Sequence, residues 1–299
     1  MIRKFLSRLR EYLNAPVLQQ LADLQKTGRQ HSNAVGQKIL ATAYRQAYLQ
    51  HCGTPPTFRD VGFRTHSQHE EDGILHYIFA LIGTANQQCV ELCAGDGIEC
   101  NTANLILNHR WTGLLCDGND GNVARARQFY TSHPDTRYWP PTIVHAWITR
   151  GNADDIIRCN GFSGEVDLLS LDMDGVDYWV WKDIGCISPR VVVLEFNHLW
   201  GPEESFSVPY SDDFVAEFGP HGSDYAGASL MAFVKLGREK GYRLVGTNGI
   251  ATNAFFVRND IYCDWLPEID PASCFNHPRA RFGISQRLPN VKNRTWVKV

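Results

Sequence analysis

Short apolar strands alternate with helical stretches from Ser67 onward, and this alternation limits the fold more than any other feature of the sequence. The expected strands are 89–93, 113–117, 142–148, 166–172 and 190–195. The last of them is apolar on both faces, as a parallel sheet covered by helices on both sides requires. Two further strands, 242–246 and 253–257, are joined by a loop too short for a parallel crossover, so they must run antiparallel. The sequence therefore predicts an α/β fold with a mostly parallel, seven-stranded sheet and a C-terminal antiparallel hairpin.

The first of these strands ends in an acidic turn broken by glycines. Glu91 lies near its end, Gly95 and Gly97 follow, and a helix is expected over 101–110. Such a turn brings backbone N–H groups, a helix N-terminus and carboxylates close to a small ligand. The third glycine of the dinucleotide fingerprint is missing because Cys100 stands in its place, which weakens an NAD-binding interpretation.

Composition excludes several other classes of protein. The formal net charge of -3 over 299 residues gives no electrostatic footprint for nucleic acid. No apolar run approaches the roughly 18 residues that a membrane span needs, and the N-terminus lacks a secretory signal. Nine cysteines without a C-x-x-C pair indicate a reduced, cytoplasmic protein with no zinc finger. Residues 2–13 form a basic amphipathic pattern, which favours a helix packed on its own domain or a second subunit over peripheral membrane contact.

Five stretches together resemble the FkbM-type group of class I S-adenosylmethionine (SAM)-dependent methyltransferases. They are 67–74, 89–97, 170–178, 194–197 and 253–258. The resemblance implies a class I methyltransferase (Rossmann-like) fold, SAM as cofactor, and methyl transfer to hydroxyl groups of sugars, polyketides or other small metabolites. It divides the chain into an N-terminal helical extension (1–60), a SAM-binding domain (61–265) and a C-terminal tail (266–299). Cys93 departs from the family motif, which has its first glycine there.

The resemblance also assigns residues to the cofactor. The loop from Ala94 to Gly97 would approach the methionine part of SAM, because glycine has no Cβ to collide with it. Asp117, at the end of the second strand, would accept hydrogen bonds from the ribose hydroxyls, although a helix cap is its common alternative role. Trp147 would contact adenine or belong to the core. The predicted cofactor-binding residues are Glu91, Ala94, Gly95, Gly97, Asp117, Gly118, Asn119, Trp147 and Ile148.

Polar pairs end the fourth and fifth strands. Asp172 and Asp174 are two residues apart, as are Glu195 and Asn197, so each pair faces one side of an extended strand. Four oxygen ligands that converge there would suit Mg²⁺ or Ca²⁺. In the alternative without a metal, Asp172 contacts substrate or cofactor and Asp174 caps the helix that begins near Tyr178.

His198 and Asp172 are the candidates for the catalytic base. A histidine of ordinary pKa is suited to take a proton from a hydroxyl near neutral pH. The leading hypothesis is therefore a SAM-dependent O-methyltransferase acting on a small-molecule acceptor. The alternatives are a non-catalytic binding or assembly protein with the same fold, and an NAD-dependent oxidoreductase. Homo-oligomerisation would involve the N-terminal helices.

Overall fold

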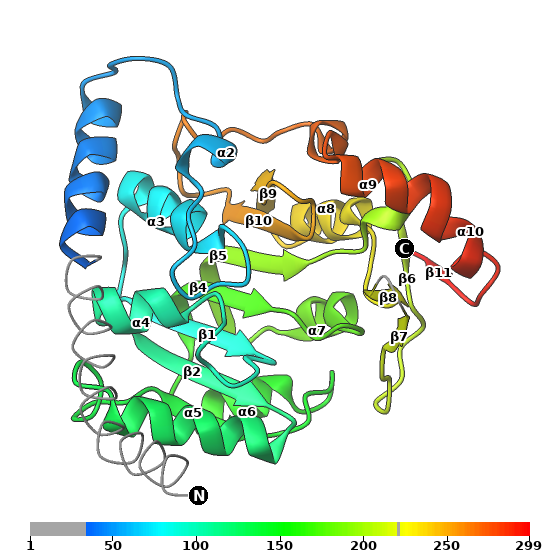
Figure 1. Cartoon of the computed structure of the whole chain (residues 1–299), viewed down its shortest axis with the longest axis horizontal. Helices are drawn as coiled ribbons and strands as arrows, with labels where there is room; N and C mark the ends of the chain where they lie inside the picture. Colours follow the sequence, from blue (N-terminus) through cyan, green and yellow to red (C-terminus); the bar gives the residue numbers. More distant parts are fainter. Residues whose placement is uncertain (1–33, 220–221) are drawn as a thin grey trace, which may run out of the picture.

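A seven-stranded sheet forms the centre of the protein in a computed structural model that describes residues 34–219 and 222–299 (Figure 1). The strand order is β3-β2-β1-β4-β5-β10-β9. The first five strands pair in parallel, whereas β10 runs antiparallel to both β5 and β9. This arrangement confirms the predicted class I methyltransferase fold. The strands are β1 (Gln88–Leu92), β2 (Thr112–Asp117), β3 (Thr142–His145), β4 (Gly164–Leu171), β5 (Ile187–Glu195), β9 (Tyr242–Thr247) and β10 (Asn253–Arg258).

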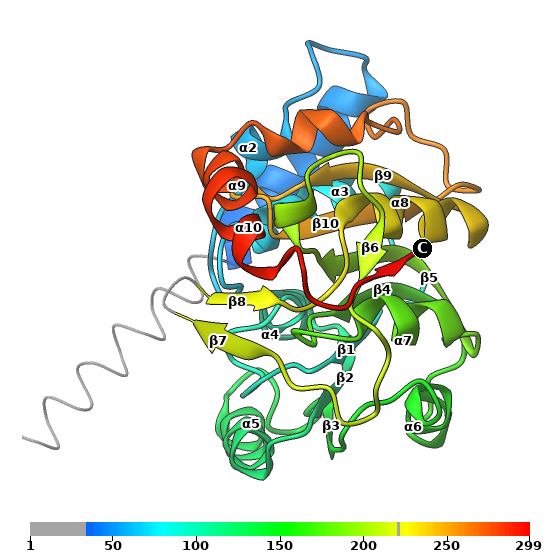
Figure 2. The same ribbon diagram turned by 90° about the vertical axis from the view of Figure 1, so that its right-hand side faces the viewer.

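Helices cover both faces of the sheet, as the apolar strands require (Figure 2). Val191 and Val193 of β5 belong to the core on one face, and Val192 and Leu194 to the core on the other. One face is covered by α3 (Glu71–Ile82), α4 (Ala103–His109) and α5 (Asp120–Ser132), and the opposite face by α6 (Ala153–Cys159), α7 (Asp177–Asp183) and α8 (Leu230–Glu239).

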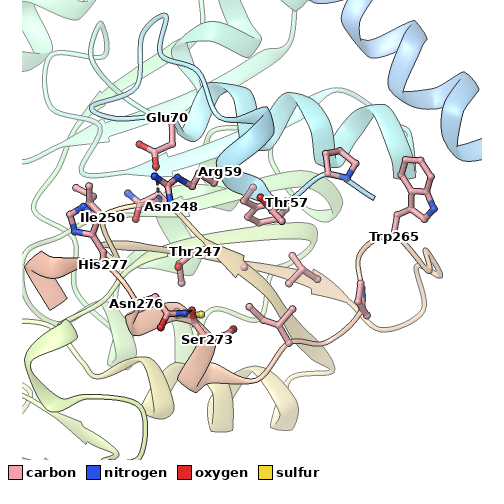
Figure 3. Close-up of a pocket in the computed structure, with 18 of the residues that line it drawn as sticks. Thr57, Arg59, Glu70, Thr247, Asn248, Ile250, Trp265, Ser273, Asn276 and His277 are labelled. Atoms are coloured by element: carbon pink, nitrogen blue, oxygen red, sulfur yellow. Dashed lines mark hydrogen bonds between the residues drawn. The ribbon is translucent and has the colours of Figure 1, made fainter. Parts of the chain in front are cut away.

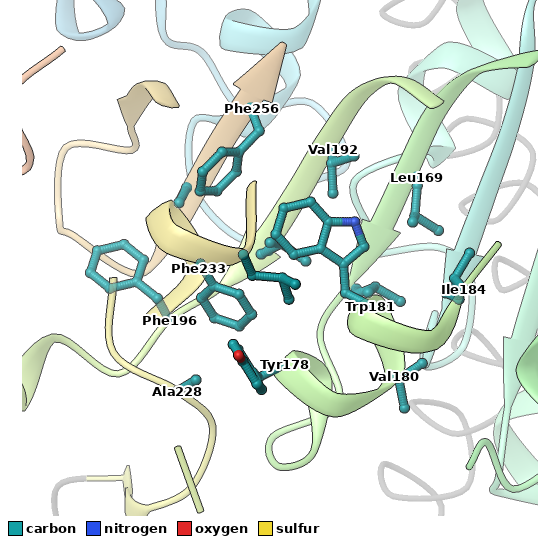
Figure 4. Packing of buried hydrophobic residues seen from close by; sticks show 14 of the residues in the cluster. Leu169, Tyr178, Val180, Trp181, Ile184, Val192, Phe196, Ala228, Phe233 and Phe256 are labelled. Atoms are coloured by element: carbon teal, nitrogen blue, oxygen red, sulfur yellow. The ribbon is translucent and has the colours of Figure 1, made fainter. Parts of the chain in front are cut away.

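Trp181 of α7 is the centre of the core on the second face (Figure 4). Its ring lies 5.5 Å from that of Phe256 on β10, 5.9 Å from Tyr242 on β9 and 6.2 Å from Phe233 on α8. All four side chains are buried. Truncation of a buried aromatic residue of this size typically costs about 3–5 kcal/mol. This packing fixes α7 against the sheet, and with it the segment after β4 that leads into the helix.

The sequence after about Trp265 is loop-like with room for short strands, but the structure of this C-terminal tail differs from that expectation. After 270 it is mostly helical: η2 (Pro271–Phe275), α9 (Pro278–Phe282), the π-type turn η3 (Gly283–Arg287) and α10 (Leu288–Val291). Each of the first two helices begins with proline, and the preceding Asp270 or His277 side chain accepts a backbone hydrogen bond. The expectation failed because these starts carry no apolar periodicity.

The tail then returns to the body of the protein. Its last strand, β11 (Val297–Lys298), pairs antiparallel with β6 (Phe206–Ser207) (Figure 2). Trp296 lies with its ring 5.1 Å from that of Trp200, which belongs to the short helix η1 (His198–Trp200). A small hairpin of β7 (Glu217–Gly219) and β8 (Gly222–Tyr225) lies beside it. The tail thus covers the carboxyl end of β5.

The N-terminal part of the described chain packs on the sheet domain. A helix whose described part covers 34–49 contacts α3 and α4. Gln37 exchanges amide hydrogen bonds with Asn104, and His76 donates to the Gln37 carbonyl at 2.7 Å. The amphipathic pattern at 2–13 lies outside the described residues. The short helix α2 (Phe58–Val61) follows. Among the described helices, none is long and apolar enough to cross a membrane.

Candidate functional site

The loop after β1 has the conformation that its glycines suggest. Gly95 and Gly97 have φ values of 57° and 67°, in the left-handed region that glycine tolerates best. Cys93 has a φ of 64°, so it adopts the glycine conformation although it carries a side chain. A Cβ on Gly97 would lie 3.2 Å from Leu115 and 3.3 Å from Tyr130, which leaves little room for any larger residue. The loop therefore stays tight despite Cys93.

Glu91 stabilises this loop from below. Its side chain is buried, and one carboxylate oxygen accepts hydrogen bonds from the Asn101 backbone at 2.9 Å and from Ser170 at 3.2 Å. The other oxygen accepts from the backbone and hydroxyl of Thr102. Thr102 is the N-cap of α4 and makes no side-chain cap of its own. Glu91 therefore satisfies the start of α4 and uses its carboxylate inside the protein, instead of facing the cofactor as we expected.

Asp117 connects the loop after β1 with the loop after β2. One carboxylate oxygen accepts the Gly95 N–H at 2.9 Å, and the other accepts from the Asn119 backbone at 2.8 Å and the Asn122 amide at 3.0 Å. The cap of α5 is Asn119, whose side chain accepts from the Asn122 N–H. A carboxylate has about four acceptor positions, so one position of Asp117 is still available to a ligand.

A cavity of about 300 Å³ opens beside Asp117, and we call it the β2 cavity. Trp147 forms one wall: it is 52% exposed, and its indole N–H donates to the Asp212 carbonyl at 2.7 Å. Gly118 permits this position, since a Cβ there would lie 2.8 Å from the Trp147 ring. β3 ends at His145, so Trp147 and Ile148 belong to a loop and not to the predicted strand. The lining residues are Cys93, Asp117, Gly118, Asn119, Trp147, Ile148, Met173, Val176, Asp212 and Phe214.

The β2 cavity unites five of the predicted cofactor residues and adds five others. Predicted and found are Asp117, Gly118, Asn119, Trp147 and Ile148. Ala94, Gly95 and Gly97 shape the adjoining loop without lining the cavity. Its indole and aliphatic walls, with a carboxylate at one end, can hold a flat ring joined to a group with hydroxyls.

Three carboxylates meet at the ends of β4 and β5, and we call them the acidic trio. An oxygen from each of Asp172, Asp174 and Glu195 lies within 4.8 Å of the others. Burial, followed by repulsion from Asp177 and Asp174, raises the pKa of Asp172 to about 7. Burial and repulsion from Asp172 also raise the pKa of Glu195. Among the described residues, no cationic side chain forms an ion pair with the trio.

The turn that carries Asp172 and Asp174 is held by a fourth carboxylate. Asp177 is buried and accepts the backbone N–H groups of Met173 at 2.8 Å and Gly175 at 3.1 Å. Asp174 has a φ of 51° and makes no cap to α7. The helix-capping alternative for Asp174 was therefore wrong, and Asp177 fixes the turn in its place.

Asn197 is held by backbone groups beside the trio. Its amide nitrogen donates to the carbonyls of Asp224 at 3.2 Å and Ala226 at 2.9 Å, and its amide oxygen accepts from the Leu199 N–H at 3.0 Å. These bonds cap η1 and attach it to the segment before α8. An amide oxygen has two acceptor positions, so Asn197 as a fourth metal ligand stays a prediction.

A second cavity, the polar cavity, of about 330 Å³ adjoins the trio. Met173 lines the β2 cavity and Asp174 lines the polar cavity, so the turn after β4 contributes to both cavities. Arg279 and Arg287 of the C-terminal tail also line the polar cavity. We did not predict them, because the motifs that resemble the family end before this tail. The lining residues are Gln68, His69, Asp174, Glu195, Phe196, Asn197, His198, Leu199, Ala226, Gly227, Thr252, Arg279 and Arg287.

His198 is not suited to act as the predicted base. It is 5% exposed, and its Nε2 has no hydrogen-bond partner among the described residues. Burial, with the positive charges of Arg279 and Arg287, lowers the pKa of His198 to about 3. A Cβ on Gly283 would lie 2.7 Å from Nε2, which shows how closely the tail covers the ring. The imidazole is therefore neutral at pH 7 but too weak a base for the predicted role.

A larger cavity of about 960 Å³ contains none of the predicted site residues (Figure 3). It lies between α2, the end of β9 and η2, with Glu70 and Asn248 on one side and Ser273 and Asn276 on the other. We call it the outer cavity. His277 and Pro278 line the outer cavity, and the next residue, Arg279, lines the polar cavity. The outer and polar cavities are therefore neighbours.

No model of a known protein family matches the sequence, and no curated protein matches it. Among solved structures, the glycopeptide N-methyltransferase MtfA with S-adenosylhomocysteine (SAH) is 11% identical, with a TM-score of 0.41 over 67% of this chain and 94% of that one. The N-terminal domain of EvdMO1 with SAH is 15% identical, with a TM-score of 0.41 over 66% and 88%.

A third similar structure is magnesium protoporphyrin IX methyltransferase from Synechocystis PCC 6803 with bound SAM. It is 12% identical, with a TM-score of 0.39 over 63% of this chain and 77% of that one. All three are SAM-dependent methyltransferases or bind the demethylated product of SAM. At such identities and TM-scores the likeness says nothing about activity, which must be argued from the residues of this chain.

Proposed function

We propose that this protein is a SAM-dependent methyltransferase that methylates a hydroxyl group of a small acceptor. The observation that carries the proposal is the β2 cavity at the carboxyl ends of β2 and β3, where doubly wound sheets bind their ligands. Asp117 at the end of β2 and the Trp147 wall supply a hydrogen-bond acceptor and a flat apolar surface. Cys100, buried in place of the third fingerprint glycine, argues against a dinucleotide.

Different residues of the β2 cavity would bind different parts of SAM. Asp117 would accept a ribose hydroxyl through its remaining acceptor position, while Gly118 and Ile148 leave the adenine room against Trp147. The loop at Gly95, which the Asp117 carboxylate holds, would approach the methionine part. SAM, when bound, supplies a methyl group on a positively charged sulfonium. The protein then has to position the acceptor oxygen and take up its proton.

Asp172 with Glu195 is the better candidate for the base. The pKa of Asp172 is raised to about 7, near the pH at which general bases work best. Asp172 lies directly before Met173, which lines the β2 cavity, and Glu195 lines the polar cavity. The acceptor hydroxyl would face this pair and give it a proton as its oxygen takes the methyl group; the carbon–sulfur bond to that methyl would break at the same time and leave SAH. The outer cavity leaves room for the remainder of a larger acceptor.

Isothermal titration calorimetry of the full chain with SAH, SAM and NAD tests the proposal. We expect SAH and SAM to bind and NAD not to bind. Asp117→Asn should weaken SAH binding by about 1.5–3 kcal/mol, the range for hydrogen bonds to charged groups. Asp120→Asn is the matched control, because Asp120 lies three residues further on, at the start of α5, with a side chain that is 85% exposed. No binding of SAH would refute the proposal, and binding of SAH without any methyl transfer would favour the non-catalytic alternative.

We also propose that the acidic trio binds a divalent cation. Three oxygen ligands from Asp172, Asp174 and Glu195 suit Mg²⁺ or Ca²⁺. Like charges so close need a cation or protons to compensate them, and no cationic side chain among the described residues pairs with them. A bound cation would keep all three ionised and would draw the acceptor hydroxyl toward the trio.

Thermal unfolding at about pH 8 tests the cation without an activity assay. Mg²⁺ or Ca²⁺ should raise the melting temperature of the wild type, as any ligand of the folded state does. Asp174→Asn should remove this effect, whereas Asp120→Asn should keep it. Equal melting temperatures of the wild type in EDTA and in Mg²⁺ or Ca²⁺ would show that protons alone compensate the trio.

A further inference from the structure

Two arginines of the C-terminal tail face the polar cavity, and only one has a carboxylate partner. Arg287 of η3 is 6% exposed, and its Nε donates to Asp224 at 2.8 Å, with a second, shorter bond from Nη2. Arg279 of α9 forms no hydrogen bond through its guanidinium and no ion pair with any described residue. One positive charge of this wall is therefore not paired directly.

None of the described carboxylates that line the polar cavity forms an ion pair with Arg279. The charge of Glu195 acts on the pKa of Arg279, but the two side chains do not reach ion-pair distance. The oxygens of Glu195 are directed toward Asp172 and Asp174, within 4.8 Å. His198, which also lines the cavity, is uncharged at pH 7, and its buried Nε2 has no hydrogen-bond partner among the described residues. The cavity thus has an acidic end at the trio and a basic end at the tail.

We propose that the polar cavity binds an acceptor with an anionic group, which Arg279 holds while the acceptor hydroxyl lies toward the trio. This inference rests on the proposed methyl transfer and narrows its substrate class to hydroxylated acids, such as a sugar acid or a sugar phosphate. A guanidinium binds carboxylate and phosphate equally well through two parallel N–H groups. The cavity volume of about 330 Å³ is near the lower limit for ligand pockets, which fits one such group.

The test uses the full chain and three sugars of similar size: D-glucuronate, D-glucose 6-phosphate and D-glucose. Calorimetric titrations at low ionic strength, with SAH present, limit screening of the charge. We expect at least one of the two acids to bind about ten-fold or more tightly than glucose, as a charged hydrogen bond predicts. The comparison of glucuronate with glucose 6-phosphate distinguishes a carboxylate ligand from a phosphate ligand. If neither acid binds more tightly than glucose, the inference is wrong.

Arg279→Gln should reduce binding of the preferred acid to the level of glucose, and Arg279→Lys should restore part of it. Arg281→Gln is the matched control, since Arg281 is exposed on the same helix and does not line the polar cavity. Circular dichroism verifies that each variant is folded. Acid binding that survives Arg279→Gln unchanged would assign Arg279 to balancing Glu195 instead. Failure of SAH itself to bind would count against the proposed function, because Arg279 does not line the β2 cavity.

Discussion

Removal of one charge from the acidic trio should stabilise the protein at alkaline pH. The ordinary pKa of Asp172 is 3.8 and its pKa in the folded protein is about 7. At 1.36 kcal/mol per unit, ionised Asp172 costs about 4 kcal/mol of folding stability. Asp172→Asn keeps the shape of the side chain without the charge, so we expect a gain of this order at about pH 8 in EDTA.

The folded and unfolded chains hold the Asp172 proton over different pH ranges, and this difference sets how stability changes with pH. Between pH 3.8 and about 7 the unfolded chain releases the Asp172 proton while the folded protein keeps it, so wild-type stability falls across this window. The contribution of Asp172 itself is level above about pH 7. Urea unfolding at several pH values should show the gain of Asp172→Asn increasing from pH 4 to 7, and Asp120→Asn should show none. A variant no more stable than the wild type at about pH 8 would refute the reasoning.

Three further predictions concern single side chains. His198→Gln should leave the pH–rate profile unchanged, because the pKa of His198 is lowered to about 3. If the variant instead loses an inflection near pH 6–7, His198 is the base. Cys93→Gly should raise the unfolding free energy by about 1 kcal/mol by relieving the left-handed φ of 64°, whereas Cys93→Ala should not; equal effects in urea unfolding would contradict this. Gly118→Ala should weaken SAH binding about ten-fold by displacing Trp147, and Gly151→Ala, whose Cβ would meet only Thr149 at 3.9 Å, should not.

The fold could be predicted because its determinants are local. Strands such as β5 are apolar on both faces, and the short link between β9 and β10 admits only an antiparallel pair. Ser229 stands directly before α8, where a serine is a common helix cap, and its side chain accepts the Ala232 N–H. The tail could not be predicted, since its helices begin at proline residues without apolar periodicity. Their position depends on contacts such as Trp296 with Trp200, almost a hundred residues apart in the sequence.

The site could be predicted only where strand ends fix it. Asp117, Asp172 and Glu195 lie at the ends of β2, β4 and β5, and parallel strands bring such ends to one edge. The roles of His198 and Asn197 depend on what covers them, and the covering segments come from the tail and from the region before α8. Burial is a property of the whole fold, so residue type alone could not show that His198 would lose its basicity.

The acidic trio also predicts how the cofactor should respond to pH. Asp172 precedes Met173 of the β2 cavity, and its charge influences the thiol of Cys93, which lines the same cavity. The sulfonium of SAM is positive and SAH has no such charge, so ionised Asp172 should favour SAM over SAH. Because the pKa of Asp172 is about 7, the ratio of SAM to SAH affinity should rise as the pH passes from about 6 to 8. Calorimetry of both ligands in EDTA, which removes any bound cation, measures the ratio, and Asp172→Asn should make it independent of pH. A ratio that is constant in the wild type would separate Asp172 from the cofactor and leave it to the acceptor alone.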